Sequence, residues 1–144
     1  GLLGSDRSKW VLLAFPLAVG AGAWAGALLP ESQAVYYMVL ASFILLGVLV
    51  AGALRISRAI FISLAVLVGL SHGAANANTD LSGWPLFLYA SGVTLAAYLL
   101  IAIATGIAVV VARQSQWGPI AVRAAGSWIV AVGLVFGSYT LMQA

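Results

Sequence analysis

The sequence predicts an all-α membrane protein, a compact bundle of five transmembrane helices that forms one domain over residues 1–144. Hydrophobic residues make up 64% of the chain and charged residues 6%, whereas a soluble domain of this length needs far more charge on its surface. The charges also fall between long uncharged runs, and each run has at least the roughly 17 residues that a helix needs to span the bilayer hydrocarbon. The lipid bilayer is therefore the first partner that we expect.

The uncharged runs define the expected helices, which cover about residues 10–29, 35–54, 59–75, 84–112 and 120–142. The fourth run is longer than a perpendicular span requires, so we expect this helix to be tilted or to begin in the interface. Glycines four residues apart, such as Gly22 and Gly26 or Gly133 and Gly137, favour close contacts between helices. Their spacing does not say which helices pair.

The charge distribution predicts the orientation of the bundle. With five spans, one side receives every basic residue, namely Arg7, Lys9, Arg55, Arg58, Arg113 and Arg123. Glu31 and Asp80 fall on the other side. Because basic loops remain in the cytoplasm, we expect Gly1 inside and Ala144 outside, in a bacterial inner membrane or its equivalent.

Several function classes do not fit this composition. The chain has no cysteine, which excludes disulfides, thiolate metal sites and cysteine nucleophiles. Its net charge of +3 is too small and too dispersed for a nucleic-acid surface. The apolar runs contain no carboxylate pair and a single histidine, so an enzyme is the class that we expect least.

The histidine is the one strong candidate for a functional side chain. His72 lies near the end of the third run, and a polar, acidic segment follows it. An ionisable residue at membrane depth is costly unless it faces protein or water, which makes it a candidate site. It can equally be structural, because an imidazole within one turn of the interface can be solvated or bonded to a backbone carbonyl. Asn76 shares its helix face if the helix continues that far.

Around His72 the sequence resembles a known family. The segment from Ser71 to Ala77, SHGAANA, followed by Trp84-Pro85, Tyr89 and Gly92, is similar to the second half of HupE/UreJ proteins. These are small membrane proteins encoded near nickel enzymes and regarded as nickel or cobalt permeases, typically with a cleaved signal peptide and six helices. Residues 7–30 resemble the family's second helix, which implies that Gly1 follows the first.

The chain departs from the family's motif at several positions. The motif reads F-H-G-x-A-x-G-x-E, and here Ser71, Ala77 and Thr79 stand in place of its phenylalanine, second glycine and glutamate. The family's next helix usually carries a second histidine, whereas the corresponding position near Leu100 is aliphatic. Of the expected ligands, His72 is the one that this chain retains.

Two functions follow from the resemblance. The first is a nickel or cobalt permease in which His72 is an entry-side metal ligand helped by Asn76, Asn78 or Asp80. The metal ion is then cargo, and no resident cofactor is expected. The second is a HupE-like accessory subunit without transport activity, which packs against other subunits of a larger membrane complex.

Overall fold

The computed structural model describes residues 5–29, 32–54, 56–114 and 116–143, and within them it confirms an all-helical bundle without strands. The helices are α1 (Ser5–Ala27), α2 (Gln33–Ala51), α3 (Arg58–Ala75), α4 (Gly83–Gln114) and α5 (Gly118–Gln143). All five are long and apolar enough to span a bilayer, so the chain is an integral membrane protein. Outside the described residues or side chains lie Gly1, Arg7, Lys9, Glu31, Arg55 and Ala144.

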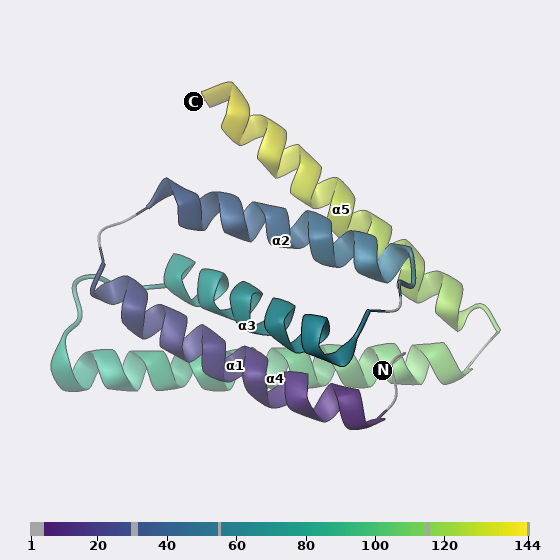
Figure 1. Cartoon of the computed structure of the whole chain (residues 1–144), viewed down its shortest axis with the longest axis horizontal. Helices are drawn as coiled ribbons and strands as arrows, with labels where there is room; N and C mark the ends of the chain where they lie inside the picture. Colours follow the sequence, from purple (N-terminus) through teal and green to yellow (C-terminus); the bar gives the residue numbers. More distant parts are fainter. Residues whose placement is uncertain (1–4, 30–31, 55, 115, 144) are drawn as a thin grey trace.

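Successive helices run in opposite directions (Figure 1). The connections from α1 to α2 and from α3 to α4 lie at one end of the bundle, and those from α2 to α3 and from α4 to α5 lie at the other. We call the first of these the His72 end, because α3 carries His72 in its last turn there. The sequence-based alternation of loops is thus present in the fold.

The closest helix pair is α1 with α3, and glycines make the close approach possible. A Cβ at Gly22 would overlap the carbonyl oxygen of Leu70, and one at Gly73 would overlap the carbonyl oxygen of Val19. Small residues allow such backbone contact where no hydrophobic effect drives helices together. Gly22 therefore packs closely against another helix, as expected. That helix is α3, which the glycine spacing alone did not identify.

A second close pair joins α2 to α5. A Cβ at Gly47 would lie 2.8 Å from the carbonyl oxygen of Gly126, and one at Gly133 would lie 3.1 Å from the Cβ of Phe43. Gly137 differs, since a Cβ there would meet no described atom within 4 Å. Only one member of the Gly133 and Gly137 pair therefore packs against another helix.

The second helix ends earlier than the expected residue 54, because α2 stops at Ala51. The amide of Ala53 donates to the carbonyl oxygen of Val50 at 3.1 Å. The amide of Leu54 donates to the carbonyl oxygen of Leu49, also at 3.1 Å. These two bonds form a Schellman motif, which requires a left-handed residue after the cap, and Ala53 adopts it with φ 49°. Hydropathy does not register such a turn, because every residue in it is apolar.

The first helix is also displaced from its expected range. It begins at Ser5 instead of residue 10, so the polar lead is helical as well. It stops at Ala27 instead of residue 29, because the amides of Leu28 and Leu29 turn back to the carbonyls of Ala25 and Gly26. The remaining helix ends differ from expectation by less than one turn.

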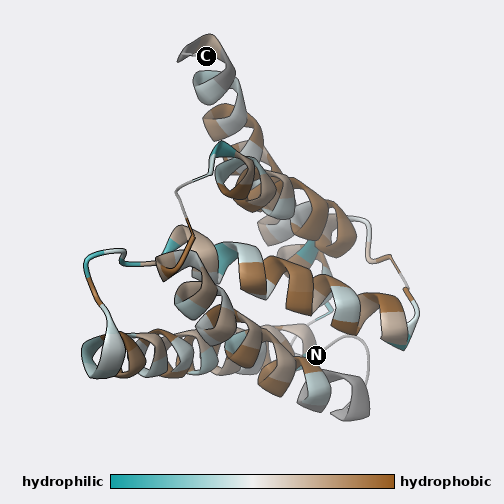
Figure 2. Ribbon diagram, turned by 60° about the vertical axis from the view of Figure 1, so that its left-hand side comes forward, coloured by the Kyte–Doolittle hydropathy of each residue, from teal (hydrophilic) through white to brown (hydrophobic). Residues whose placement is uncertain are grey.

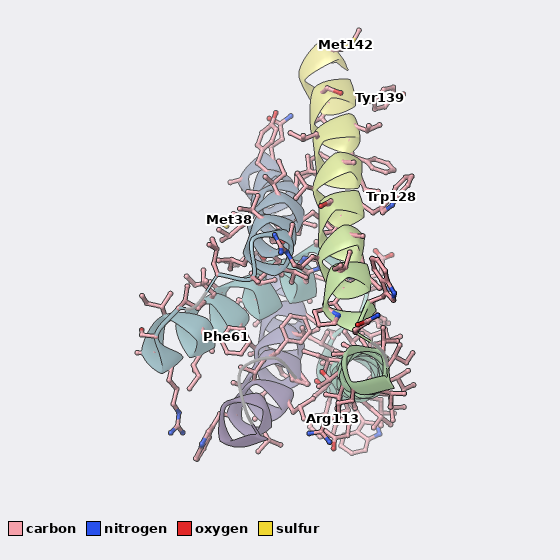
Figure 3. All side chains as sticks on the ribbon, turned by 90° about the vertical axis from the view of Figure 1, so that its right-hand side faces the viewer. Met38, Phe61, Arg113, Trp128, Tyr139 and Met142 are labelled. Carbon is pink, nitrogen blue, oxygen red and sulfur yellow. The ribbon has the colours of Figure 1, made fainter. Side chains whose placement is uncertain are left out.

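The outer surface is apolar over most of the length of the helices. Figure 2 shows hydrophobic residues dominating the helices and hydrophilic ones gathered at the connections. On α5, Trp128 is 75% exposed and Tyr139 60%, and both point away from the neighbouring helices (Figure 3). Lipid covers such surfaces in a membrane protein, as composition predicts.

Candidate functional site

His72 lies in the last turn of α3, half-buried between that helix and α2. Its Nε2 is 2.9 Å from the hydroxyl oxygen of Ser42 on α2. The ring of Phe43 meets the imidazole edge-on, with 5.7 Å between the ring centroids. The histidine is thus held by a neighbouring helix and is not simply solvated at the interface.

Ser42 is unusual for its position, because it is a buried hydroxyl in an apolar helix, with 5% of its surface exposed. Its Oγ also bonds the carbonyl oxygen of Val39, at 2.7 Å. Sequence reasoning missed this residue, since thirty positions separate it from His72. A signal was present nonetheless: Ser42 is the only serine or threonine between residues 35 and 54, and a polar group inside a membrane helix calls for a partner.

Asn76 ends α3 and caps it. Its backbone amide donates to the carbonyl oxygens of His72 and Gly73, and its side-chain Nδ2 donates to the carbonyl oxygen of His72 at 2.8 Å. The Asn76 carbonyl accepts a 2.7 Å hydrogen bond from the hydroxyl of Tyr89 on α4. The side chain therefore bonds the backbone of His72, and among the described residues no hydrogen bond joins it to the imidazole ring. Its Oδ1 is the atom left over for a ligand.

The connection between α3 and α4 carries the other predicted residues. Asn78 Oδ1 accepts a 3.0 Å hydrogen bond from the backbone amide of Asp80, which forms a local turn. Asp80 is exposed, and among the described residues no interaction joins its carboxylate to His72. The structure thus brings His72 and Asn76 together, while Asp80 stands apart on the loop at the same end.

The donors available for a metal ion are few. Within the described part of the chain no cluster of three or more histidine, cysteine, aspartate or glutamate residues is present. One imidazole with amide and carboxylate oxygens is a weak donor set for a borderline divalent metal, which prefers several nitrogens. Weak coordination suits transient contact better than permanent storage, because an ion that is held tightly cannot leave.

Comparison with known proteins identifies the relatives of this chain. The model of the family described as HupE / UreJ protein matches residues 1–136, which is nearly its whole length. Comparisons with curated proteins and with solved structures gave no match. The family match covers all of α1 to α4 and most of α5, including His72 and the residues around it. The chain therefore belongs to the HupE/UreJ family.

Proposed function

We propose that this protein carries a divalent transition-metal ion, nickel or cobalt, across the membrane, and that His72 is a nitrogen ligand where the ion enters. The family is associated with nickel and cobalt transport. The single observation that carries the proposal is the placement of the only histidine. It sits in the last turn of a membrane helix, with one ring nitrogen on Ser42 and the other without a partner among the described residues.

The other predicted ligands have supporting roles in this proposal. Asp80 is exposed at the His72 end and contributes the negative charge that draws a cation toward it. Asn76 offers Oδ1 next to the histidine, because its Nδ2 is already engaged with the backbone. A path of few, weak ligands fits an ion that must be released again.

The distribution of basic residues supports entry from outside. Arg58, Arg113 and Arg123 lie near the end of the bundle opposite His72. Cytoplasmic loops are enriched in lysine and arginine, so that end is the cytoplasmic one in our proposal. His72 then faces the periplasm or the exterior, where a scarce metal ion has to be captured.

The test is nickel or cobalt accumulation in cells that lack other uptake systems for these metals. The informative variant is His72→Gln, since a glutamine amide can still donate to Ser42 while it offers no imidazole nitrogen to a metal. We expect accumulation to fall to the background of cells without the protein, at an unchanged protein level. Asp80→Asn should give a partial loss.

The matched control is Ser71→Ala. Ser71 is buried beside His72, but its hydroxyl bonds only the carbonyl oxygen of Val68 among the described residues, at 2.9 Å. This variant should accumulate metal like the wild type. Undiminished accumulation in His72→Gln, or none with the wild-type protein, would defeat the permease proposal and leave the role of accessory subunit.

A further inference from the structure

The contact between Ser42 and His72 indicates which of the two side chains donates the hydrogen bond, because the Ser42 hydroxyl has a second partner. Ser42 Oγ lies 2.7 Å from the carbonyl oxygen of Val39 and 2.9 Å from His72 Nε2. A serine hydroxyl has one hydrogen to donate, and a backbone carbonyl can only accept. If the Ser42 hydroxyl donates its hydrogen to the Val39 carbonyl oxygen, the other hydrogen bond must be donated by the Nε2–H of His72 to Ser42 Oγ.

Other hydroxyls of this protein support that assignment of the hydrogen. Within the helices, serine and threonine donate to the carbonyl three or four residues earlier, at Ser71, Ser91, Thr94, Ser127, Ser138 and Thr140. The preference is physical, since a helical hydroxyl in an apolar setting finds its nearest acceptor in its own preceding turn. Ser42 makes the same bond as the others.

A second contact between helices repeats the construction. Thr140 Oγ1 donates to the carbonyl of Phe136 at 2.9 Å, and it lies 3.0 Å from the hydroxyl of Tyr36. Its one hydrogen is already used, so Tyr36 is the donor between α2 and α5. In both places a helix hydroxyl donates backwards within its own helix and accepts from a side chain on another helix.

We infer that Ser42 is a positioning residue, which fixes neutral His72 as the Nε2–H tautomer and leaves Nδ1 as the nitrogen that binds the metal ion. In neutral imidazole one nitrogen carries the hydrogen and the other the lone pair, and a ligand can bind only at the lone pair. Nδ1 has no partner among the described residues. Every buried side-chain nitrogen or oxygen of the described residues has a hydrogen-bond partner. Because Nδ1 has none, it is not one of these buried atoms and is accessible at the surface of the half-buried ring. The identity of the ion rests on the proposed function.

The inference can be tested first without any metal, because the chain contains a single histidine. Protein labelled with ¹⁵N-histidine and reconstituted in lipid vesicles gives one pair of ring-nitrogen signals. At about pH 8, where an ordinary imidazole is neutral, we expect a directly bound hydrogen on Nε2 and a lone pair on Nδ1. A directly bound hydrogen on Nδ1 instead would overturn the assignment, whether or not the protein transports metal.

The same sample then tests the ligand atom. Zn²⁺ is a diamagnetic probe that binds imidazole nitrogen, so it can replace nickel in the spectrometer. Titration with Zn²⁺ should shift the Nδ1 signal strongly and leave hydrogen on Nε2. A shift that shows the metal on Nε2, with the hydrogen moved to Nδ1, would contradict the inference even if nickel uptake is normal.

Variants of Ser42 provide the functional arm of the test. Ser42→Ala removes the acceptor for Nε2–H, so the histidine signals should show a mixture of tautomers. Loss of a hydrogen-bond partner behind a metal ligand typically lowers metal affinity by about 10- to 100-fold, and nickel uptake at low concentration should fall accordingly. Ser42→Thr keeps the hydroxyl and should restore both readouts. Ser71→Ala is the control, which should retain the wild-type tautomer and uptake.

These outcomes separate the inference from the proposed function. A wild-type spectrum with Nε2–H and a shift of Nδ1 by Zn²⁺, together with full nickel uptake by His72→Gln, would refute transport through His72 but keep the tautomer. Unchanged tautomer and uptake in Ser42→Ala would refute the role of Ser42 and keep the permease.

Discussion

Arg123 on α5 caps the end of α2: its Nε donates to the carbonyl oxygen of Ala51 at 2.7 Å. The last carbonyls of a helix have no partner within the helix, and a cation there also interacts favourably with the helix dipole. One side chain thus ties together two helices that also pack through glycines. Arg123 is exposed, which fits a guanidinium at the headgroup level.

We predict that Arg123→Gln lowers the free energy of unfolding in detergent micelles by about 1 kcal/mol, the usual net value of one hydrogen bond. The control is Arg113→Gln, which removes the same charge from the end of α4. Arg113 lies in the last turn of α4, so it also interacts favourably with a helix dipole, but it has no hydrogen-bond partner among the described residues, and its loss should cost less. Equal destabilisation by the two substitutions would indicate a general effect of charge and not of the cap.

The left-handed Ala53 predicts a substitution that stabilises the protein. Its φ of 49° is a conformation that costs a residue with a Cβ roughly 1 kcal/mol and costs glycine almost nothing. Ala53→Gly should therefore raise the free energy of unfolding by up to about 1 kcal/mol. The same substitution at Ala41, exposed within α2, should lower it by about as much. Loss of stability at Ala53 as well would show that the turn does not have this conformation.

The contact of Gly22 with α3 predicts a strong effect of a single methyl group. In Gly22→Ala the new Cβ would overlap the carbonyl oxygen of Leu70, which is backbone and cannot rotate away. We expect a loss of about 1–3 kcal/mol in the free energy of unfolding. Gly92→Ala on α4 is the matched control, since a Cβ there meets no described atom within 4 Å. If the two variants unfold alike, α1 and α3 do not pack as closely as described.

The sequence predicted the five spans because the cost of polar groups in hydrocarbon acts on every residue of a span, and a sum over about twenty residues is a strong signal. It predicted the ends less well, since the end of α2 depends on the conformation of Ala53 and not on its polarity. The contact of α1 with α3 could have been suspected, because Gly69 and Gly73 repeat the four-residue spacing of Gly22 and Gly26.

The candidate site was predicted only in part, because it depends on a contact between two helices. His72 stands out in the sequence because it is the one histidine in an apolar chain. Its partner Ser42 is an ordinary residue, and what makes it important is a contact across two helices that no local pattern encodes. Asn76 was expected beside His72 by helical spacing, and its side chain bonds the backbone carbonyl of His72, so that it caps the helix.

The orientation can be measured by cysteine labelling, for which the chain provides no background because it has no cysteine. Thr79 lies exposed on the connection at the His72 end, and Gln116 lies exposed at the opposite end. A maleimide that cannot cross the membrane should label Thr79→Cys in intact cells and label Gln116→Cys only after lysis. The reverse pattern would mean that the protein has the opposite orientation in the membrane, with the His72 end on the cytoplasmic side.

The most direct test of the central claim uses purified protein in lipid vesicles, where no other subunit or transporter is present. Vesicles with a nickel-sensitive dye inside receive external nickel and an inside-negative membrane potential. We predict that wild-type protein fills the vesicles faster than protein-free lipid does, and that His72→Gln, at equal reconstitution, does not. Filling by His72→Gln at the wild-type rate, or no filling by the wild type above the protein-free rate, would contradict transport through His72.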